Sequence, residues 1–585
     1  MTRALVAAVL FAWTSASATQ SQTPGATTPG QGAGPLAVRP QGARTPPRAQ
    51  APNAEAGRGT AVLRGQIVAA DSGTPIRRAQ VRVSGVGLRD ARVTTTDAQG
   101  RFEVRELAAG RYTLTASKGG FVTLQYGQRR PGESGTPLEI GDAQTLDKLI
   151  IGLPRGSVIS GRITDEFGEP VVNAAVTAWR YAFVGGTRRL VRAGARDTTD
   201  DQGLYRLFGL APGDYLVSGV LRTGEVTDAG DDLSGFAPTY FPGTPNSTEA
   251  QRVRVALSQE QGGISFGLLA TRLVRVWGQV ISATGTPHWG GMVMLSGANG
   301  AEAQRGPGFL QGGSGGRIEG DGSFYIGNVA PGRYQLQARA GDRQNGEFAR
   351  MDLTVGLEDV AGLMVVTAPA GRIQGTVVTD TGDPLPAGAG GVQVIARPAV
   401  PDLPIAGPAG AGGGQARVGA DGAFDLGNVT DSRLLRVNAP SGWALRAVRS
   451  NGNDVTDVPL DVAPGQVMTG VEVVITKKLS HAEGAVLDAR KQPVLDATVV
   501  LFPINENLRG VQSRFIRSAR PDQEGRFRLS ALPPGEYLAI AVQGLEDGQD
   551  SDPEFLAAVE DQAIRVTIED GETKSVTLGL SQVPR

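Results

Sequence analysis

The stretch "DDQGLYRLFGLAPGDY" at residues 200–215 decides the fold, because versions of it occur at five places in the chain. Residues 97–112 read "DAQGRFEVRELAAGRY", residues 319–334 read "EGDGSFYIGNVAPGRY" and residues 522–537 read "DQEGRFRLSALPPGEY". A weaker version, "GADGAFDLGNVTDSRL" at 419–434, lacks the second glycine and the tyrosine. An acidic run that occurred once could be a metal or acid–base site, whereas recurrence at regular spacing indicates a folding signal.

A second element recurs ahead of each version. It reads "GRITDEFGEPVVNAAV" from Gly161, and its counterparts begin at Gly65, Gly278, Gly375 and Gly484. These glycines are roughly 100 residues apart, which is the size of a β-sandwich domain and longer than a solenoid or propeller repeat. We therefore predict five domains, at residues 61–155, 156–273, 274–370, 371–478 (the degenerate copy) and 479–585.

Alternation of apolar and polar residues predicts strands within each unit. In "RFEVREL", Phe102 and Val104 alternate with charged residues, as in a half-buried antiparallel strand. The Asp-x-x-Gly before it predicts a turn in which the carboxylate accepts backbone N–H groups and the glycine adopts a positive φ angle. The fold class is therefore all-β: a tandem array of five immunoglobulin-like or transthyretin-like β-sandwiches after a disordered N-terminal segment.

The two elements together resemble the carboxypeptidase regulatory-like domain, a transthyretin-like sandwich also grouped with carbohydrate-binding-like folds. The resemblance extends over residues 61–585 and is clearest in the first, second and fifth units. In its overall run, including "SNGNDVTDVPLDV" at 450–462, the chain is similar to large secreted proteins of acidobacteria. The resemblance implies the fold but not a function, because such domains are attached to many kinds of protein.

The N-terminal residues predict export. "MTRALVAAVLFAWTSASATQ" has a basic start, a short apolar run and a small-residue cleavage pattern, so residues 1–18 are expected to be a signal peptide. Residues 19–60 are rich in Pro, Gly, Ala and Thr and are expected to form a disordered tether. No later stretch is apolar enough for a transmembrane segment, and the chain has no cysteine. We expect a periplasmic or extracellular, cell-surface location.

Composition argues against several functions. Lys plus Arg number 57 and Asp plus Glu 58, which disfavours a nucleic-acid partner. The two histidines, His288 and His481, lie in different units and are expected to face solvent. They cannot supply the ligands of a zinc peptidase or a base next to a serine nucleophile. The acidic clusters do not match a calcium loop, so the sequence predicts no enzyme, metal or cofactor.

The second unit carries the residues most typical of a binding site. These candidates are aromatic rings and arginines outside the shared motif: Trp179, Tyr181, Arg188, Arg189, Tyr240 and Phe241. The alternative is that Trp179 and Tyr181 share one strand face and pack in the sandwich. One exposed aromatic platform would favour carbohydrate binding, whereas buried and scattered rings would favour a structural role.

The sequence as a whole predicts a non-catalytic, exported, multi-domain binding or scaffold protein of the cell envelope or exterior. Its expected partner is a carbohydrate or an envelope or surface protein. Two alternatives stay open: a carbohydrate-binding accessory protein of a polysaccharide-degrading system, and a purely structural surface rod. Glycine-rich insertions at 297–316 and 386–416 are expected to be flexible surface loops.

Overall fold

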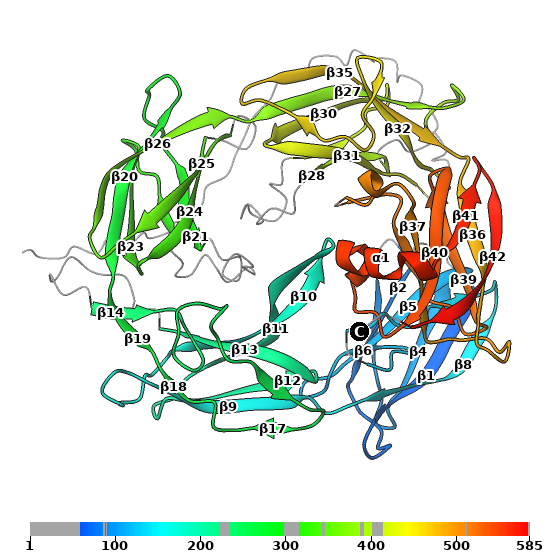
Figure 1. The fold of residues 1–585 in the computed structure, drawn as a ribbon, viewed down its shortest axis with the longest axis horizontal. Coiled ribbons are helices and arrows are strands. Elements are labelled where there is room, and N and C mark those ends of the chain that lie inside the picture. Colours follow the sequence, from blue (N-terminus) through cyan, green and yellow to red (C-terminus); the bar gives the residue numbers. More distant parts are fainter. Residues whose placement is uncertain are drawn as a thin grey trace, which may run out of the picture. The chain divides into compact units, whose positions relative to one another are not determined.

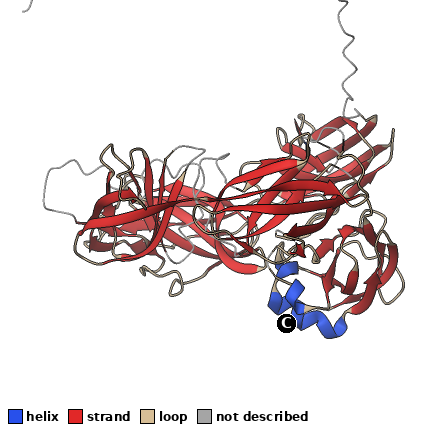
Figure 2. Ribbon diagram, turned by 90° about the horizontal axis from the view of Figure 1, so that it is seen from above, coloured by secondary structure: helices blue, strands red, loops and turns tan. Residues whose placement is uncertain are grey.

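Strands dominate the computed structural model (Figures 1 and 2). It describes residues 59–85, 88, 91–130, 132–221, 234–297, 315–341, 346–386, 391–399, 414–440, 442–510 and 512–582. The expected signal peptide, nearly all of the expected tether and most of both glycine-rich insertions lie outside the described residues. The predicted all-β class is confirmed. In the described part of the chain, no helix has the length and apolar character needed to cross a membrane.

The described residues form five separate sandwich cores, each from one continuous segment of sequence. We call these segments sandwich 1 to sandwich 5. Their buried apolar residues fall within 61–153, 159–268, 274–365, 373–475 and 482–578.

The strands of sandwiches 1 and 2 are short and follow one another closely. In sandwich 1 they are β1 (Ala61–Ala69), β2 (Gln80–Gly85), β3 (Arg92–Thr95), β4 (Arg101–Leu107), β5 (Gly110–Ser117), β6 (Leu124–Gln125), β7 (Leu138–Ile140) and β8 (Thr145–Leu153). In sandwich 2 they are β9 (Ser157–Thr164), β10 (Ala175–Val184), β11 (Thr187–Thr198), β12 (Leu204–Leu210), β13 (Gly213–Val220), β14 (Ser234–Ala237), β15 (Thr239–Tyr240), β16 (Val253–Val255), β17 (Glu260–Gln261), β18 (Phe266–Gly267) and β19 (Leu269–Arg272).

Sandwiches 3 and 4 follow the same order of strands. Sandwich 3 contains β20 (Val274–Ser282), β21 (Gly291–Gly297), β22 (Gly315–Arg317), β23 (Ser323–Val329), β24 (Gly332–Ala340), β25 (Glu347–Val355) and β26 (Val360–Pro369). Sandwich 4 contains β27 (Gly371–Thr379), β28 (Gln393–Pro398), β29 (Gln415–Arg417), β30 (Ala423–Val429), β31 (Ser432–Asn438), β32 (Ala444–Ser450), β33 (Asn453–Asp454), β34 (Leu460–Asp461) and β35 (Val467–Thr476).

Sandwich 5 adds short helices to the strands. Its elements are β36 (Ser480–Leu487), β37 (Ala497–Pro503), η3 (Glu506–Leu508), β38 (Arg517–Ala519), β39 (Arg526–Leu532), β40 (Gly535–Gln543), η4 (Gln549–Ser551), α1 (Pro553–Val559), η5 (Glu560–Gln562), β41 (Ile564–Ile568) and β42 (Thr573–Ser581). Helix α1 begins at Pro553, and the Asp552 side chain accepts a hydrogen bond from the Phe555 N–H. Its apolar side, which includes Phe555 and Leu556, buries the outer face of β37 and β40.

One pairing pattern is common to the five sandwiches. The first strand of each lies between an antiparallel partner and a parallel closing strand. In sandwich 1, β1 pairs antiparallel with β4 and parallel with β8 (Figure 1). The equivalent parallel pairs are β9 with β17 and β18, β20 with β26, β27 with β35 and β36 with β42.

A glycine on each first strand allows this pairing. A Cβ atom on Gly65 would overlap the carbonyl oxygen of Leu149 on the closing strand and the ring of Phe102 on β4. The same overlap with a closing-segment carbonyl occurs at Gly161, Gly278, Gly375 and Gly484. These are the glycines that open the recurring sequence element, so their recurrence follows from contact between backbones.

The Asp-x-x-Gly turns form as predicted. The Asp200 carboxylate accepts hydrogen bonds from the N–H groups of Gln202 at 3.0 Å and Leu204 at 2.8 Å. Gly203 closes this turn with a φ angle of 72°, in the left-handed region that favours glycine. Asp97 and Asp522 make the same two kinds of bond in sandwiches 1 and 5. The interpretation of these aspartates as turn caps is confirmed.

The tyrosine that ends the motif fixes the following corner. The Tyr215 hydroxyl donates to the carbonyl of Ala211 at 2.5 Å, and the equivalent tyrosines of sandwiches 1, 3 and 5 bond to the residue four positions earlier. Sandwich 4 has Leu434 at this position. There the guanidinium of the buried Arg433 donates to the equivalent carbonyl, that of Thr430, at 2.6 Å.

Replacement of Gly65 by alanine is expected to destabilise sandwich 1 by about 3 kcal/mol, because the added methyl group has no space between two paired strands. The control is Gly119→Ala, since a Cβ atom there meets nothing within 4 Å. Hydrogen–deuterium exchange of the full chain would report the opening of β1, β4 and β8. Equal protection of these strands in both variants would contradict the explanation.

Candidate functional site

The candidate site of sandwich 2 is built on a long hairpin. Strands β10 and β11 pair from Ala175 opposite Thr198 to Val184 opposite Thr187. The two residues between the strands, Gly185 and Gly186, have φ angles of 60° and 75°. Only glycine adopts two successive positive φ angles without strain, and this geometry matches the twist of paired strands. The "VGGT" sequence therefore fixes the register that places the candidate side chains.

Trp179 lies on the outer face of the hairpin sheet. It forms a small apolar cluster with Leu190, Leu216 and Tyr240, separate from the main core of sandwich 2. Only 7% of Trp179 and 5% of Tyr240 is exposed. The Trp179 Nε1–H donates to Ser218 Oγ at 2.8 Å, which satisfies the indole. The main role of this cluster is to cover a sheet face that no second sheet covers.

Tyr181 is the partly open member of this face. Its ring is half-buried against the Trp179 cluster, and two guanidiniums lie over it. The Arg188 and Arg252 guanidinium carbons are 5.3 Å and 5.9 Å from the ring centroid, and that of Arg192 is 6.0 Å from a Trp179 ring. These distances fit cation–π contacts. We call Tyr181, Arg188, Arg192 and Arg252 the arginine-rimmed face.

The other two candidates lie elsewhere. Phe241 follows Tyr240 directly but packs against the main core, where its ring meets Phe266 edge-on at a centroid distance of 6.1 Å. Arg189 pairs with Ala182, so alternation places it on the opposite face of the hairpin from Arg188. The structure thus brings together Trp179, Tyr181, Tyr240 and Arg188, but the aromatic rings do not form one exposed platform. Sequence reasoning did not find Arg252, because it comes from a loop distant in sequence.

His288 lies in a polar cluster of sandwich 3. Its Nε2 is 2.8 Å from Glu347 Oε2 and 2.9 Å from Thr367 Oγ1, and the Thr367 hydroxyl donates to Glu347 at 2.7 Å. A nucleophile–base–acid triad needs its hydroxyl and carboxylate on different ring nitrogens. Both partners here share one nitrogen, and Thr367 is fully buried. This cluster connects β25 and β26 and lacks the arrangement of a hydrolase.

His481 is also removed from solvent. Its Nδ1 is buried and has no hydrogen-bond partner among the described residues, and burial, followed by the charge of Arg528, lowers its pKa. The expectation that both histidines face solvent is therefore wrong, because both are held by strand pairing or by a carboxylate. Within the described residues, no group of three or more His, Asp or Glu side chains could hold a metal ion.

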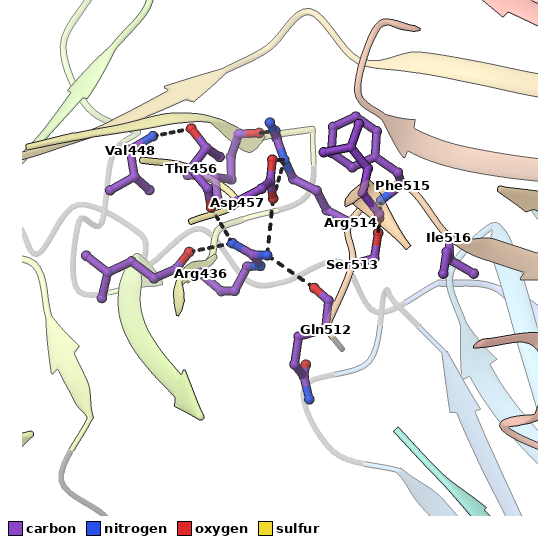
Figure 3. Close-up of polar contacts among 12 residues, drawn as sticks. Arg436, Val448, Thr456, Asp457, Gln512, Ser513, Arg514, Phe515 and Ile516 are labelled. Atoms are coloured by element: carbon purple, nitrogen blue, oxygen red, sulfur yellow. Dashed lines mark hydrogen bonds and ion pairs between the residues drawn. The ribbon is translucent and has the colours of Figure 1, made fainter. Parts of the chain in front are cut away.

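A charged cluster joins sandwiches 4 and 5 (Figure 3). Asp457 accepts from Arg436 at 3.2 Å and from Arg514 at 2.9 Å. Arg436 also donates to the carbonyls of Thr456 and Gln512, so it contacts both sandwiches. Burial lowers the pKa of the Arg436 guanidinium, and the charge of Asp457 opposes this. The side chains of Arg436, Arg514 and Asp457 are only 13%, 17% and 21% exposed, so this cluster fixes the junction.

The fold and these sites define a tandem β-sandwich protein whose described features are faces and junctions. Residues 62–147, which form most of sandwich 1, match the carboxypeptidase regulatory-like domain family. The resemblance seen in the sequence is confirmed for this segment. A search of curated proteins gives no significant match.

Three solved structures illustrate the fold similarity. A streptococcal ancillary pilin is similar with 15% identity and a TM-score of 0.20, over 52% of this chain and 98% of that one. The Bacillus anthracis TIE protein is similar with 11% identity and a TM-score of 0.15, over 73% of each chain. A putative carbohydrate binding protein from Pseudomonas aeruginosa is similar with 13% identity and a TM-score of 0.12, over 16% of this chain and 88% of that one.

Substitution of Trp179 by alanine is expected to destabilise sandwich 2 by about 3 kcal/mol, because it removes a buried ring and leaves Ser218 without its donor. Tyr181→Ala removes a half-buried ring and is expected to cost about 1 kcal/mol. Hydrogen exchange of β10 and β13 in the full chain would measure both. An equal effect of the two substitutions would show that the cluster has no dominant buried member.

Substitution of Asp457 by asparagine is expected to open the junction between sandwiches 4 and 5 by about 2 kcal/mol, since two half-buried guanidiniums lose their counter-charge. The control is Glu472→Gln, which removes the exposed pair with Arg449 and should change stability by less than about 1 kcal/mol. Hydrogen exchange of residues 512–516 is the measurement. Unchanged exchange in the Asp457 variant would contradict a role at the junction.

Proposed function

We propose that this protein is an exported, non-catalytic scaffold of the cell envelope or exterior, and that the arginine-rimmed face of sandwich 2 binds a partner protein. The single observation that carries this proposal is the pair of exposed arginines, Arg188 and Arg252, over the partly open ring of Tyr181. Tyrosine and arginine are enriched among the residues that contribute most to protein–protein binding.

The charge of this face supports an acidic partner. Arg188, Arg192 and Arg252 make no ion pair within the part of the chain that the structure describes, and all three are exposed. Their positive charges are therefore available to carboxylates of another molecule, which increases the rate and the selectivity of association. The buried Trp179 beneath them keeps the hairpin rigid, so little side-chain order has to be gained on binding.

A carbohydrate-binding role is the second candidate. One observation favours it: Tyr181 presents part of a flat ring beside hydrogen-bond donors, which suits an acidic sugar. The burial of Trp179 and Tyr240 counts against stacking of a neutral sugar on several rings. The accessory role in polysaccharide degradation depends on this candidate, and a purely structural rod needs neither kind of partner.

The test compares the full mature chain with an Arg188→Glu/Arg252→Glu variant in an envelope-protein pull-down and on an array of neutral and acidic glycans. A matched control, Arg77→Glu/Arg490→Glu, makes the same charge change at exposed positions in other sandwiches. We expect the wild type and the control to retain one envelope protein and the Arg188/Arg252 variant to lose it. The retention should weaken as salt screens the charges.

Each other outcome has a defined meaning. Selective binding of acidic glycans that needs Arg188 and Arg252 would replace the protein partner with the carbohydrate candidate. Equal behaviour of all three proteins would remove the arginine-rimmed face from the function.

A further inference from the structure

The junction of sandwiches 3 and 4 contains a pocket of about 330 Å³. A single residue, Ala370, separates β26 from β27, so one strand runs almost directly into the next sandwich (Figure 1). The junction is further fixed by a backbone hydrogen bond of 2.8 Å from the Gly465 N–H to the Pro369 carbonyl. Because both chain connectivity and hydrogen bonding hold the two sandwiches here, the pocket is preformed.

The floor of the pocket is the outer face of β24, β25 and β26. Phe348 lies at its centre, opposite Arg339 on β24 and Ala368 on β26. The wall comes from sandwich 4, where Val429, Val462 and Pro464 present apolar atoms. A pocket of this size with mostly apolar walls and few polar groups is typical of a small-molecule site.

Arg339 is the unusual member of the lining. Its guanidinium carbon lies 5.6 Å from the Phe348 ring centroid, and it makes no hydrogen bond or ion pair with any described residue. The other lining charges, Arg350 and Asp431, form an ion pair with each other at 3.6 Å. The pocket therefore has one positive charge without a counter-charge, half-buried beside an aromatic ring. A guanidinium is suited to bidentate binding of a carboxylate.

We propose that this pocket binds a small aromatic acid, with its ring on Phe348 and between the apolar walls and its carboxylate on Arg339. One carboxylate neutralises the one uncompensated charge of the lining, and a flat ring fills the space between Phe348 and Pro464. This site is separate from the arginine-rimmed face of sandwich 2 and does not depend on the function proposed for it.

The test uses three probes with the full mature chain in calorimetric titrations. They are 3-phenylpropanoate, its neutral amide 3-phenylpropanamide, and acetate, which lacks the ring. We expect 3-phenylpropanoate to bind about tenfold or more tightly than either of the others, because only it satisfies both the charge and the apolar floor. Failure of 3-phenylpropanoate to bind, or equal binding of the amide, would overturn the proposal.

Two variants locate the site. Arg339→Gln is expected to reduce 3-phenylpropanoate affinity about tenfold or more, whereas Arg333→Gln, on the exposed part of the same strand, should leave it unchanged. Ala368→Trp fills the floor beside Phe348 and should abolish binding while retaining Arg339. Thermal unfolding of each variant confirms that sandwich 3 is folded. Unaltered affinity in both Arg339→Gln and Ala368→Trp would place the probe elsewhere and overturn the assignment.

Discussion

Contact between a glycine and a carbonyl oxygen constrains every sandwich. On the first strand of each, a glycine lies where a side chain would overlap the backbone of the closing segment. The space above the glycine is filled by the aromatic residue paired with it, such as Phe102 opposite Gly65 or Phe424 opposite Gly375. The first strand can therefore pair on both edges, which connects the start and the end of each unit in one sheet. This makes each unit a closed core rather than an open hairpin.

Sandwich 4 shows which parts of the motif can be replaced. It keeps Gly375, Phe424 and the turn glycine Gly422, but it has lost the corner tyrosine. Arg433 supplies a donor to the carbonyl that the tyrosine would reach. Many side chains can donate to a carbonyl, whereas only glycine leaves room for a backbone, so the degenerate copy retains the steric requirement and changes the donor.

The fold was predictable because its constraints are local and repeated. The turn aspartates, the first-strand glycines and the period-two apolar pattern each identify their own element without knowledge of distant contacts. The candidate site was predictable only in part. Alternation places Trp179 and Tyr181 on one face, but a register shift between Thr177 and Trp179 decides how that face meets β11. Arg252 and the Phe266 partner of Phe241 come from distant loops, which a strand pattern cannot place.

The same reasoning locates where functional specificity can arise. Residues of the repeated motif are occupied in making the core, so they are nearly interchangeable among sandwiches. What differs is the outer face of a sheet and the contact between successive units. The one-residue connection at Ala370 leaves apolar residues of two sandwiches facing each other with an uncompensated Arg339, whereas the junction after sandwich 4 neutralises its arginines with Asp457. Equal folds joined differently therefore yield one junction that is filled by its own side chains and one that has space for a ligand.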